Sequence, residues 1–377
     1  MAKRDAVNRT VQVGDVCRAL ERIAPLHLAQ EWDNVGLLAG DNRAPVRRML
    51  LCIDLTGAVV TEALRAKIDL VMAYHPPIFK PVDRLVAQGG GADAHVFRCV
   101  AAGVAVYSMH TALDAAEGGT NDTLARLCGI EQTEPMVYAA VGPDRCKLVT
   151  FVPPDQADAV AQACFSAGAG HIGDYEMCSY SVAGCGTFKG GQSTRPAVGR
   201  AGRYETVEEL RLETVTPKSR LPQVIQALRR AHPYEEPAFD VYPLEAEPVR
   251  GIGRVGRLPR SITLAALARK LRRVLPAPCT LVVGQPDIRV ERALICVGSA
   301  GSLPFSWPLQ AGDVIVTGEI RHHDALTLRR SGCCAIALSH WASERPGLVP
   351  LAQRLARMLP RVKVSLSKAD ADPFAKP

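Results

Sequence analysis

Short apolar runs alternate with amphipathic stretches over most of the chain. The first section, from Asp15 to about Ile130, opens with an amphipathic stretch and then alternates buried-strand and helical patterns. Its predicted strands span residues 49–55, 69–74 and 104–108, and its predicted helices follow Thr56, lie near Ala94–Ala102 and lie near Asn121–Cys128. Short apolar strands separated by helices of about ten residues are typical of βαβ units around a largely parallel sheet. This section is therefore predicted to be α/β.

The last section of the chain resumes the same alternation. It contains predicted strands at 293–299, 313–318 and 334–339, a helix from His322, and a long helix from about Ser343 to Met358. Because the two outer sections share one pattern, we expect them to form two halves of a single sheet, separated by an insertion.

The middle section, about Arg145 to Leu244, has a different order of elements. Strand, turn and helix occur twice, with a Gly-rich polar stretch between them and a closing strand. Two such units in tandem predict a split βαβ, ferredoxin-like module. We therefore expect an α/β core with mainly parallel sheets and flanking helices, carrying an inserted α+β domain. The expected bounds are 1–144 for the first half of the core, 145–245 for the insert and 246–377 for the second half.

Composition and charge exclude several classes of protein. The chain of 377 residues is 47% hydrophobic and 22% charged, which argues against disorder. No apolar stretch approaches the roughly 20 residues that cross a bilayer, and the basic start lacks the apolar core of a secretory signal. The net charge of +7 permits an anionic small molecule, but no dense Lys/Arg run favours nucleic acid. The twelve scattered cysteines are predicted to be thiols in a reduced cytoplasm.

Histidines and a carboxylate follow the predicted strands. The residues at these strand ends are His75, His110, Glu319, His322, His323 and His340. Open parallel sheets bind their ligands at the carboxyl ends of the strands. We therefore predict a polar site that is assembled from several strand ends.

Two of these histidines have a carboxylate four positions later. His110 is followed by Asp114, and His340 is followed by Glu344. If a helical turn begins at each histidine, its carboxylate lies on the same helix face and both side chains can bind one ion. Imidazole with carboxylate suits Zn, Fe, Mn or Ni. The repeated pair predicts a transition-metal site.

Five segments of the outer sections resemble the motifs of the Nif3-like (DUF34) family, whose members are often labelled GTP cyclohydrolase 1 type 2 homologues. They are E-W-D-N-V-G-L-L (31–38), A-Y-H-P-P-I-F-K-P (73–81), Y-S-M-H-T-A-L-D-A-A-E-G-G-T-N-D (107–122), G-E-I-R-H-H-D-A-L (318–326) and S-H-W-A-S-E-R (339–345). The middle section resembles the PII/CutA-like insert of longer members, with H-P-Y-E-E-P-A (232–238) as its clearest signature. The resemblance implies a dinuclear metal centre and a homohexamer, a trimer of dimers.

Carried onto this chain, the resemblance implies that His75, Asp114, His340 and Glu344 bind two divalent transition-metal ions, with Glu344 or Asp114 available to bridge them. One position departs from the family pattern, because bacterial members usually have two adjacent histidines where this chain has Tyr74 and His75. Tyrosine has a reference pKa of about 10 and is a poorer ligand than imidazole. We therefore expect one ion to bind firmly and the second to bind weakly, or with His110 as its ligand.

Three functions are compatible with these residues. The first is a metal-dependent hydrolase, of cyclohydrolase type on a purine nucleotide such as GTP, with Glu319, His322, His323 or His110 in acid–base roles. The second is a non-catalytic metal carrier or a hexameric assembly whose insert senses a small molecule. The third is a nucleic-acid-binding scaffold, which the diffuse charge supports poorly. No cofactor site apart from the metal ligands and no membrane partner is predicted.

Overall fold

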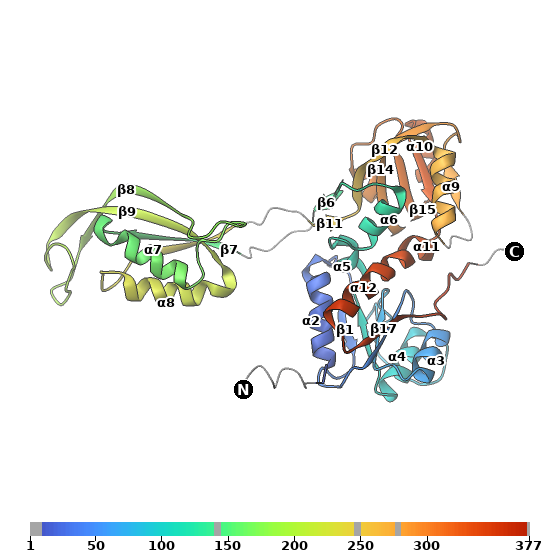
Figure 1. Ribbon diagram of the computed structural model, residues 1–377, viewed down its shortest axis with the longest axis horizontal. Helices are drawn as coiled ribbons and strands as arrows, with labels where there is room; N and C mark the ends of the chain where they lie inside the picture. The colour runs from blue at the N-terminus through green and yellow to red at the C-terminus, as the bar shows by residue number, and fades with distance from the viewer. Residues whose placement is uncertain (1–9, 139–144, 245–249, 276–279, 375–377) are drawn as a thin grey trace. The chain divides into compact units, whose positions relative to one another are not determined.

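The computed structural model describes residues 10–138, 145–244, 250–275 and 280–374 (Figure 1). The chain divides into two compact units, one made of residues 1–140 with 248–377 and the other of residues 141–247.

The first unit contains two separate sheets. The five-stranded sheet has the order β1 (Gly36–Ala39), β4 (Ala105–Ser108), β3 (Leu70–Ala73), β2 (Arg48–Cys52) and β17 (Lys363–Leu366). The six-stranded sheet has the order β13 (Leu281–Val283), β16 (Cys334–Ala337), β15 (Val314–Glu319), β14 (Arg289–Ser299), β12 (Arg254–Thr263) and β5 (Thr133–Glu134). A further pair joins β6 (Val137–Tyr138) to β11 (Gly251–Ile252). The expectation of one sheet in two halves is therefore wrong.

Each sheet forms a separate layer, because helices pack on both of its faces through apolar clusters. The chain also crosses between the two sheets, since β5 of the first section pairs with β12 and β17 of the last section pairs with β2. The first sheet is mainly parallel, with only β1 antiparallel to its neighbour. The second sheet departs from the predicted pattern, because only β14, β15 and β16 are parallel while β5, β12 and β13 pair antiparallel.

Nine α-helices are found in the described part of the first unit. They are α2 (Val13–Ile23), α3 (Gly57–Arg65), α4 (Ala92–Ala101), α5 (His110–Ala115), α6 (Thr120–Cys128), α9 (Leu264–Val274), α10 (His322–Arg330), α11 (His340–Glu344) and α12 (Leu348–Met358). The single helix predicted from Ser343 to Met358 is wrong, because a 3₁₀ turn at Arg345–Gly347 separates α11 from α12. Pro346 lies in that turn and has no N–H to continue an α-helical ladder. None of the helices in the described ranges has the length and apolarity that crossing a membrane requires.

Alternate residues of each buried strand enter different clusters, as the pleat of a strand requires. In the five-stranded sheet, Met49 and Leu51 pack toward α2 and α12, whereas Leu50 and Cys52 pack toward α3 and α4. In the six-stranded sheet, Ile295 faces the cluster that contains α6 and α9, and its neighbours face the cluster that contains Leu328 of α10. The apolar clusters on both faces hold each sheet in place, and with it the strand ends that carry the site residues.

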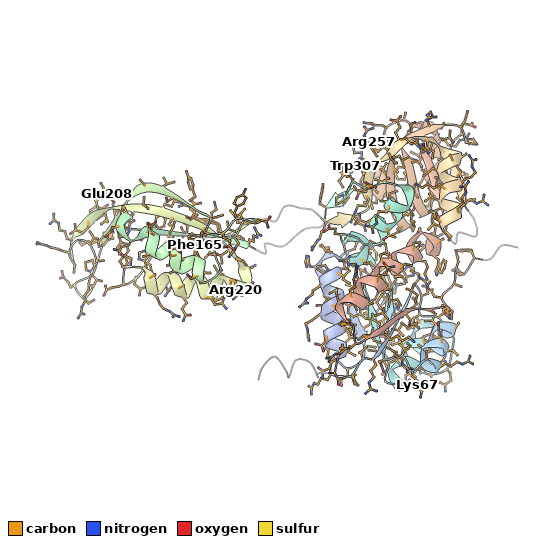
Figure 2. The ribbon with its side chains drawn as sticks, viewed as in Figure 1. Lys67, Phe165, Glu208, Arg220, Arg257 and Trp307 are labelled. Carbon is orange, nitrogen blue, oxygen red and sulfur yellow. The ribbon has the colours of Figure 1, made fainter. Side chains whose placement is uncertain are left out.

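The second unit is a four-stranded antiparallel sheet with two helices on one face. Its elements are β7 (Arg145–Val152), α7 (Ala157–Ser166), β8 (Ser179–Lys189), β9 (Tyr204–Pro217), α8 (Leu221–Ala231) and β10 (Phe239–Leu244). The strand order is β10-β7-β9-β8. Leu148 and Leu212 of the sheet share a buried cluster with Val160 and Leu228 of the helices, and Phe165 packs against it (Figure 2). This is the order of elements that the sequence predicts for the middle section.

Candidate metal centre

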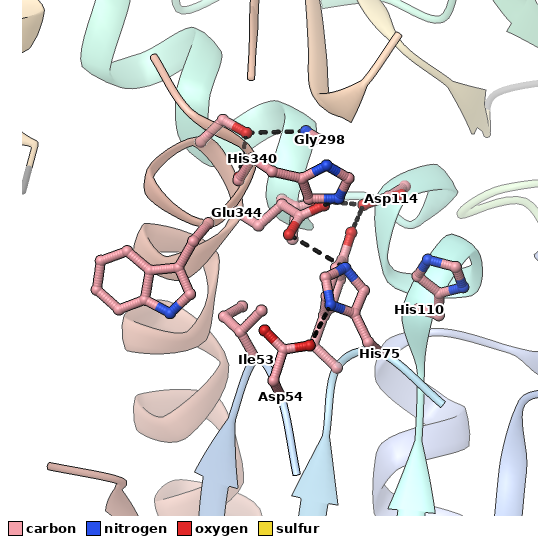
Figure 3. A network of polar contacts seen from close by, with 12 residues as sticks. Ile53, Asp54, His75, His110, Asp114, Gly298, His340 and Glu344 are labelled. Carbon is pink, nitrogen blue, oxygen red and sulfur yellow. Dashed lines mark hydrogen bonds and ion pairs between the residues drawn. The ribbon is translucent and has the colours of Figure 1, made fainter. Parts of the chain in front are cut away.

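Three of the predicted ligands converge on one point in the first unit (Figure 3). His75 follows β3, and His340 and Glu344 lie on α11. One ligand atom from each lies within 4.8 Å of the other two. Nε2 of His75 is 3.3 Å from Oε2 of Glu344, and Nε2 of His340 is 3.1 Å from Oε1. Each oxygen of the carboxylate thus faces one imidazole.

The local backbone explains why α11 presents both of its ligands on one side. Ser339 precedes the helix with φ of +85°, and its hydroxyl accepts a hydrogen bond from the N–H of Ala342. The helix then begins at His340, so that residues four apart share a face. Gly298 lies behind the pair, where a Cβ would be 2.4 Å from Glu344 Oε1 and 3.0 Å from His340 Nε2. A glycine at φ of +62° leaves this space to the two ligands.

A carboxylate holds the Nδ1 atom of each histidine near the centre. Asp54 Oδ1 lies 2.9 Å from Nδ1 of His75, and Glu319 Oε1 lies 3.1 Å from Nδ1 of His340. Asp33 Oδ1 lies 2.8 Å from Nδ1 of His110. A carboxylate at Nδ1 fixes the tautomer and the orientation of the ring and leaves Nε2 free for an ion or a proton.

The charges of the three converging residues compensate one another. Burial alone would lower the pKa of His75, but Asp54 and Glu344 raise it to about 10. Burial likewise opposes the charged form of His340, and Glu344 again raises its pKa. Glu344 is only 3% exposed, and the two imidazoles lower its pKa although burial would raise it. A buried carboxylate is therefore stabilised here by positive charge, which an ion supplies as well as protons do.

These residues fit a divalent transition ion. Two imidazoles and one carboxylate are a common ligand set for Zn, Fe, Mn or Ni. Among the described residues, Oε2 of Glu344 accepts no hydrogen bond of good geometry, although the His75 ring lies beside it. A buried acceptor of this kind has unused capacity for a cation.

Asp114 and Tyr74 are held together beside the centre. The Tyr74 hydroxyl donates to Oδ1 of Asp114 at 2.5 Å, and the Thr120 hydroxyl donates to the same oxygen. Burial raises the pKa of Asp114 to about 6, and burial with the Asp114 charge raises that of Tyr74 well above its usual value. Tyr74 is therefore a neutral donor to Asp114. The ring of His110 is 5.4 Å from that of His75, so it borders the same space.

The remaining predicted residues lie in two different places. Glu319 lies against His340, as described above, and therefore positions that ring. His322 and His323 are exposed in the first turn of α10, with their rings 5.5 Å apart. Within the described ranges, no hydrogen bond or ion pair joins either of them to the three converging ligands.

Two carboxylates of the site have no place in the sequence-based set of candidates. Asp54 lies two residues after the end of β2, as His75 does after β3, and the rule that selected His75 could have selected it too. Asp33 lies in a loop before β1, and its side chain is fully buried against His110 and Thr111. Only its place inside the motif 31–38 marks it in the sequence. Hydrogen bonds from His110 and Thr111 lower the pKa of Asp33 despite its burial.

The chain is similar to a known family and to bacterial proteins. The family model described as Duf34/NIF3 (NGG1p interacting factor 3) matches residues 11–373. A Mycobacterium tuberculosis protein named GTP cyclohydrolase 1 type 2 homolog is 38% identical over 341 residues, which cover 89% of each chain. The Bacillus subtilis protein of the same name is 33% identical over 371 residues, covering 97% of this chain and 99% of that protein.

Solved structures give the same result. A Bacillus cereus protein related to NIF3 superposes with a TM-score of 0.79 at 32% identity, covering 98% of this chain and 100% of that chain. Staphylococcus aureus protein SA1388 superposes with a TM-score of 0.80 at 26% identity, covering 97% and 99%. The resemblance of the motifs is thereby confirmed over nearly the whole sequence. The chain belongs to the Duf34/NIF3 family.

Proposed function

We propose that this protein is a metal-dependent hydrolase that acts on a planar, nucleotide-like substrate. The observation that carries the proposal is the convergence of His75, His340 and Glu344, with both imidazoles oriented by carboxylates. These three residues would hold the first ion. A divalent ion bound there would lower the pKa of a water molecule and polarise a substrate oxygen or ring carbon.

We place a second, weaker ion position between His110 and Asp114, which accounts for the dinuclear centre that family membership suggests. The weakness follows from the local bonding, because Tyr74 and Thr120 both donate to Oδ1 of Asp114. An ion that used this oxygen would displace two hydroxyl donors. Burial and the Asp114 charge also raise the pKa of Tyr74, so its hydroxyl stays protonated and acts as a hydrogen-bond donor rather than as a metal ligand.

In protein that holds only the first ion, His110 is the residue that we assign to proton transfer. Asp33 accepts from Nδ1–H of its ring, which leaves Nε2 as a proton acceptor facing the shared space. The ring is only partly buried, with 17% of its side chain exposed, so a substrate can reach it. His322 and His323 remain candidates for contact with the outer part of a substrate, because both are exposed near Glu319 in sequence.

Two aromatic side chains beside His110 support a substrate with a flat ring. Trp32 and Phe79 are 60% and 47% exposed, and their ring centroids are 5.9 Å apart. The Trp32 ring is also 6.0 Å from the His110 ring. Exposed aromatic faces stack readily on nucleobases. Together with the names of the relatives, this makes GTP the first substrate to test.

The test combines metal analysis with product analysis on the full chain. Protein loaded with Zn, Mn, Fe or Ni should convert GTP, while His340→Ala and Glu344→Gln should lose both the ion and turnover. His171→Gln is the matched control, because it removes an exposed imidazole of the second unit. A fully occupied centre that leaves GTP and related nucleotides unchanged would contradict the hydrolase assignment.

A non-catalytic role is the second candidate, and a specific feature favours it. The second unit carries a cleft of its own, described below, which a sensing assembly would need. A metal carrier would instead transfer its ion to a metal-free acceptor chelator at a useful rate. A nucleic-acid scaffold would show salt-sensitive DNA or RNA binding, which the modest net charge of +7 does not favour.

Domain identity, assembly and compartment belong to the same proposal. The strand-helix-strand-strand-helix-strand order supports a ferredoxin-like, PII/CutA-like assignment of the second unit. The exposed apolar side chains of Val82, Leu85 and Val86 support self-association into the homohexamer. The eleven free thiols of the described residues support a reducing cytoplasm. Light scattering and the redox state of the native protein test the last two points.

A further inference from the structure

The second unit contains a cleft of about 640 Å³ on the face of its sheet that is opposite α7 and α8. Strand alternation identifies this face. Ser181 of β8 pairs with Leu212, which packs in the helix-covered cluster, so Val182, Gly184, Gly186 and Phe188 point to the other side. A cleft of this size is in the range that encloses a small organic ligand.

The floor of the cleft is flat because two of these positions lack side chains. A Cβ on Gly184 would meet one atom within 4 Å, the carbonyl oxygen of Glu209 at 3.9 Å. A Cβ on Gly186 would be 2.2 Å from Oε2 of Glu209, so the carboxylate lies directly over this glycine. The two glycines therefore open the floor and bring an acidic group to it.

The walls come from the strands of this face, from the loop between β8 and β9 and from the segment after α8. Phe151, Phe188 and Val198 supply apolar surface, and the loop before β9 is attached to the segment after α8. This attachment is a hydrogen bond of 2.8 Å from the N–H of Arg195 to Oε2 of Glu235. The hydroxyl of Tyr234 donates to Oε1 of Glu209 at 2.8 Å and fixes the acidic group in place.

The charges of the lining favour a cation over an anion. Glu209, Glu235 and Glu236 all line the cleft. Arg211 also lines it, but its guanidinium is paired with Glu213 at 2.8 Å and lies over the Phe151 ring at 5.7 Å. Lys147 also lies 2.8 Å from the Glu213 carboxylate, so this group serves two cations, but the three glutamates still outnumber Arg211 in the lining. Among the described residues, Glu209 and Glu235 accept hydrogen bonds from neutral donors, a hydroxyl and a backbone N–H.

We propose that this cleft binds a planar heteroaromatic ligand that carries amino or protonated ring N–H groups. The flat glycine floor and the two phenylalanines contact its faces, and Glu209 with Glu235 accepts from its N–H groups. The site is separate from the metal ligands, all of which belong to the first unit, and it does not depend on the hydrolase proposal. It would give the assembly a means of responding to a small molecule.

The test uses the full chain and the planar cation proflavine, whose fluorescence reports binding. We expect one proflavine per chain, and at least tenfold weaker binding for Gly184→Val, which fills the floor without a backbone clash. Glu209→Gln, which removes the charge but keeps the shape, should weaken binding about tenfold. Ser181→Val, on the opposite face of the same strand, is the matched control and should bind as the wild type does.

Three results would overturn the proposal. They are absence of proflavine binding, equal binding by Gly184→Val, and equally tight binding of the planar anion anthracene-9-carboxylate. Circular dichroism and the thermal midpoint verify that each variant is folded. Glu344→Gln should bind proflavine normally, so that failure of this site and failure of the metal site are distinguished.

Discussion

The helices α5 and α11 begin with the same spacing of histidine and carboxylate but present them differently. In α11, the rings and oxygens of His340 and Glu344 meet at 3.1 Å. In α5, His110 is bound to Asp33, and Asp114 is bound to Tyr74 and Thr120. One pair is ready to bind an ion together, and the other pair is divided between two hydrogen-bond networks.

The backbone accounts for this difference. In α11 the unusual conformation falls on Ser339, before the helix, so His340 already has helical geometry. In α5 it falls on the histidine itself, because His110 has φ of +28°. The rule that residues four apart share a face holds only when both residues are helical. Equal spacing therefore does not guarantee equal function.

Removal of the two carboxylates is the strongest way to test this contrast. Glu344→Gln should reduce the affinity for the first ion by more than about 100-fold, because a buried ligand is lost. Asp114→Asn should leave that ion bound and affect only a second one. Mass spectrometry of metal content decides between them. Equal losses in the two variants would mean that both carboxylates bind the same ion.

Tyr74 tests whether the α5 pair can be made to resemble the α11 pair. Tyr74→His removes a donor from Asp114 and adds an imidazole, so bound metal should rise toward two ions per chain. Tyr74→Phe is the control, because it frees Asp114 without adding a ligand. If Tyr74→His leaves the stoichiometry unchanged, the proposed second position is wrong.

Replacing the carboxylates that contact Nδ1 of the histidines should reduce the affinity for the first ion to different degrees. Asp54→Asn should weaken the first ion by about 10- to 100-fold, since it holds the His75 ring. Glu319→Gln should weaken it less, because its contact is longer and its side chain is 49% exposed. Asp33→Asn should leave this affinity unchanged while reducing turnover through His110. Calorimetric titration of metal-free protein measures the metal affinity of all three variants, and an activity assay measures the turnover of Asp33→Asn. A loss of the first ion in Asp33→Asn would place His110 among its ligands.

The smallest expected effect concerns the C-terminal segment that holds α11. Asp370 accepts from Ile53 N–H and from the Trp341 indole, and Glu62 accepts from Ser367, Lys368 and Ala369. These hydrogen bonds lower the pKa of Glu62, although its burial acts in the other direction. Their stabilisation is therefore present above the usual pKa of the group, 4.5, and is lost as the pH falls below it.

Glu62→Gln should accordingly lower the thermal midpoint by about 1–2 °C at pH 7, and the difference should vanish in acid. Glu131→Gln, an exposed carboxylate, is the control. A difference that persists in acid after Glu62 is protonated in the folded protein would show that the charge of Glu62 is not what anchors the segment.

Local patterns in the sequence predict most of the elements and the ligands that lie at strand ends. The strands before His75, His110 and His340 are found within a few residues of their predicted bounds, and helix periodicity correctly pairs His340 with Glu344. Apolar runs do not specify which strands are neighbours, which is why two sheets were expected to be one. β5 pairs with a strand of the last section and β17 pairs with a strand of the first, and this pairing depends on contacts between distant parts of the chain.

The contacts around the site were less predictable for the same reason. Asp33 meets His110 and Asp114 meets Tyr74 through folds of the chain that spacing does not encode. The positive φ of His110 has no signal in the sequence, since few residues other than glycine adopt such a conformation. Side chains on one short element can thus be predicted, but their partners on other elements cannot.

The distribution of the ligands along the polypeptide has a consequence during synthesis. His75 leaves the ribosome long before His340 and Glu344, and the segment that anchors α11 through Asp370 follows later still. The second unit, whose sheet and helices come from one continuous stretch, can fold in the meantime. Loading of the cation must therefore wait until translation is nearly complete, and a nascent chain that stalls before α11 would carry a folded insert but no metal.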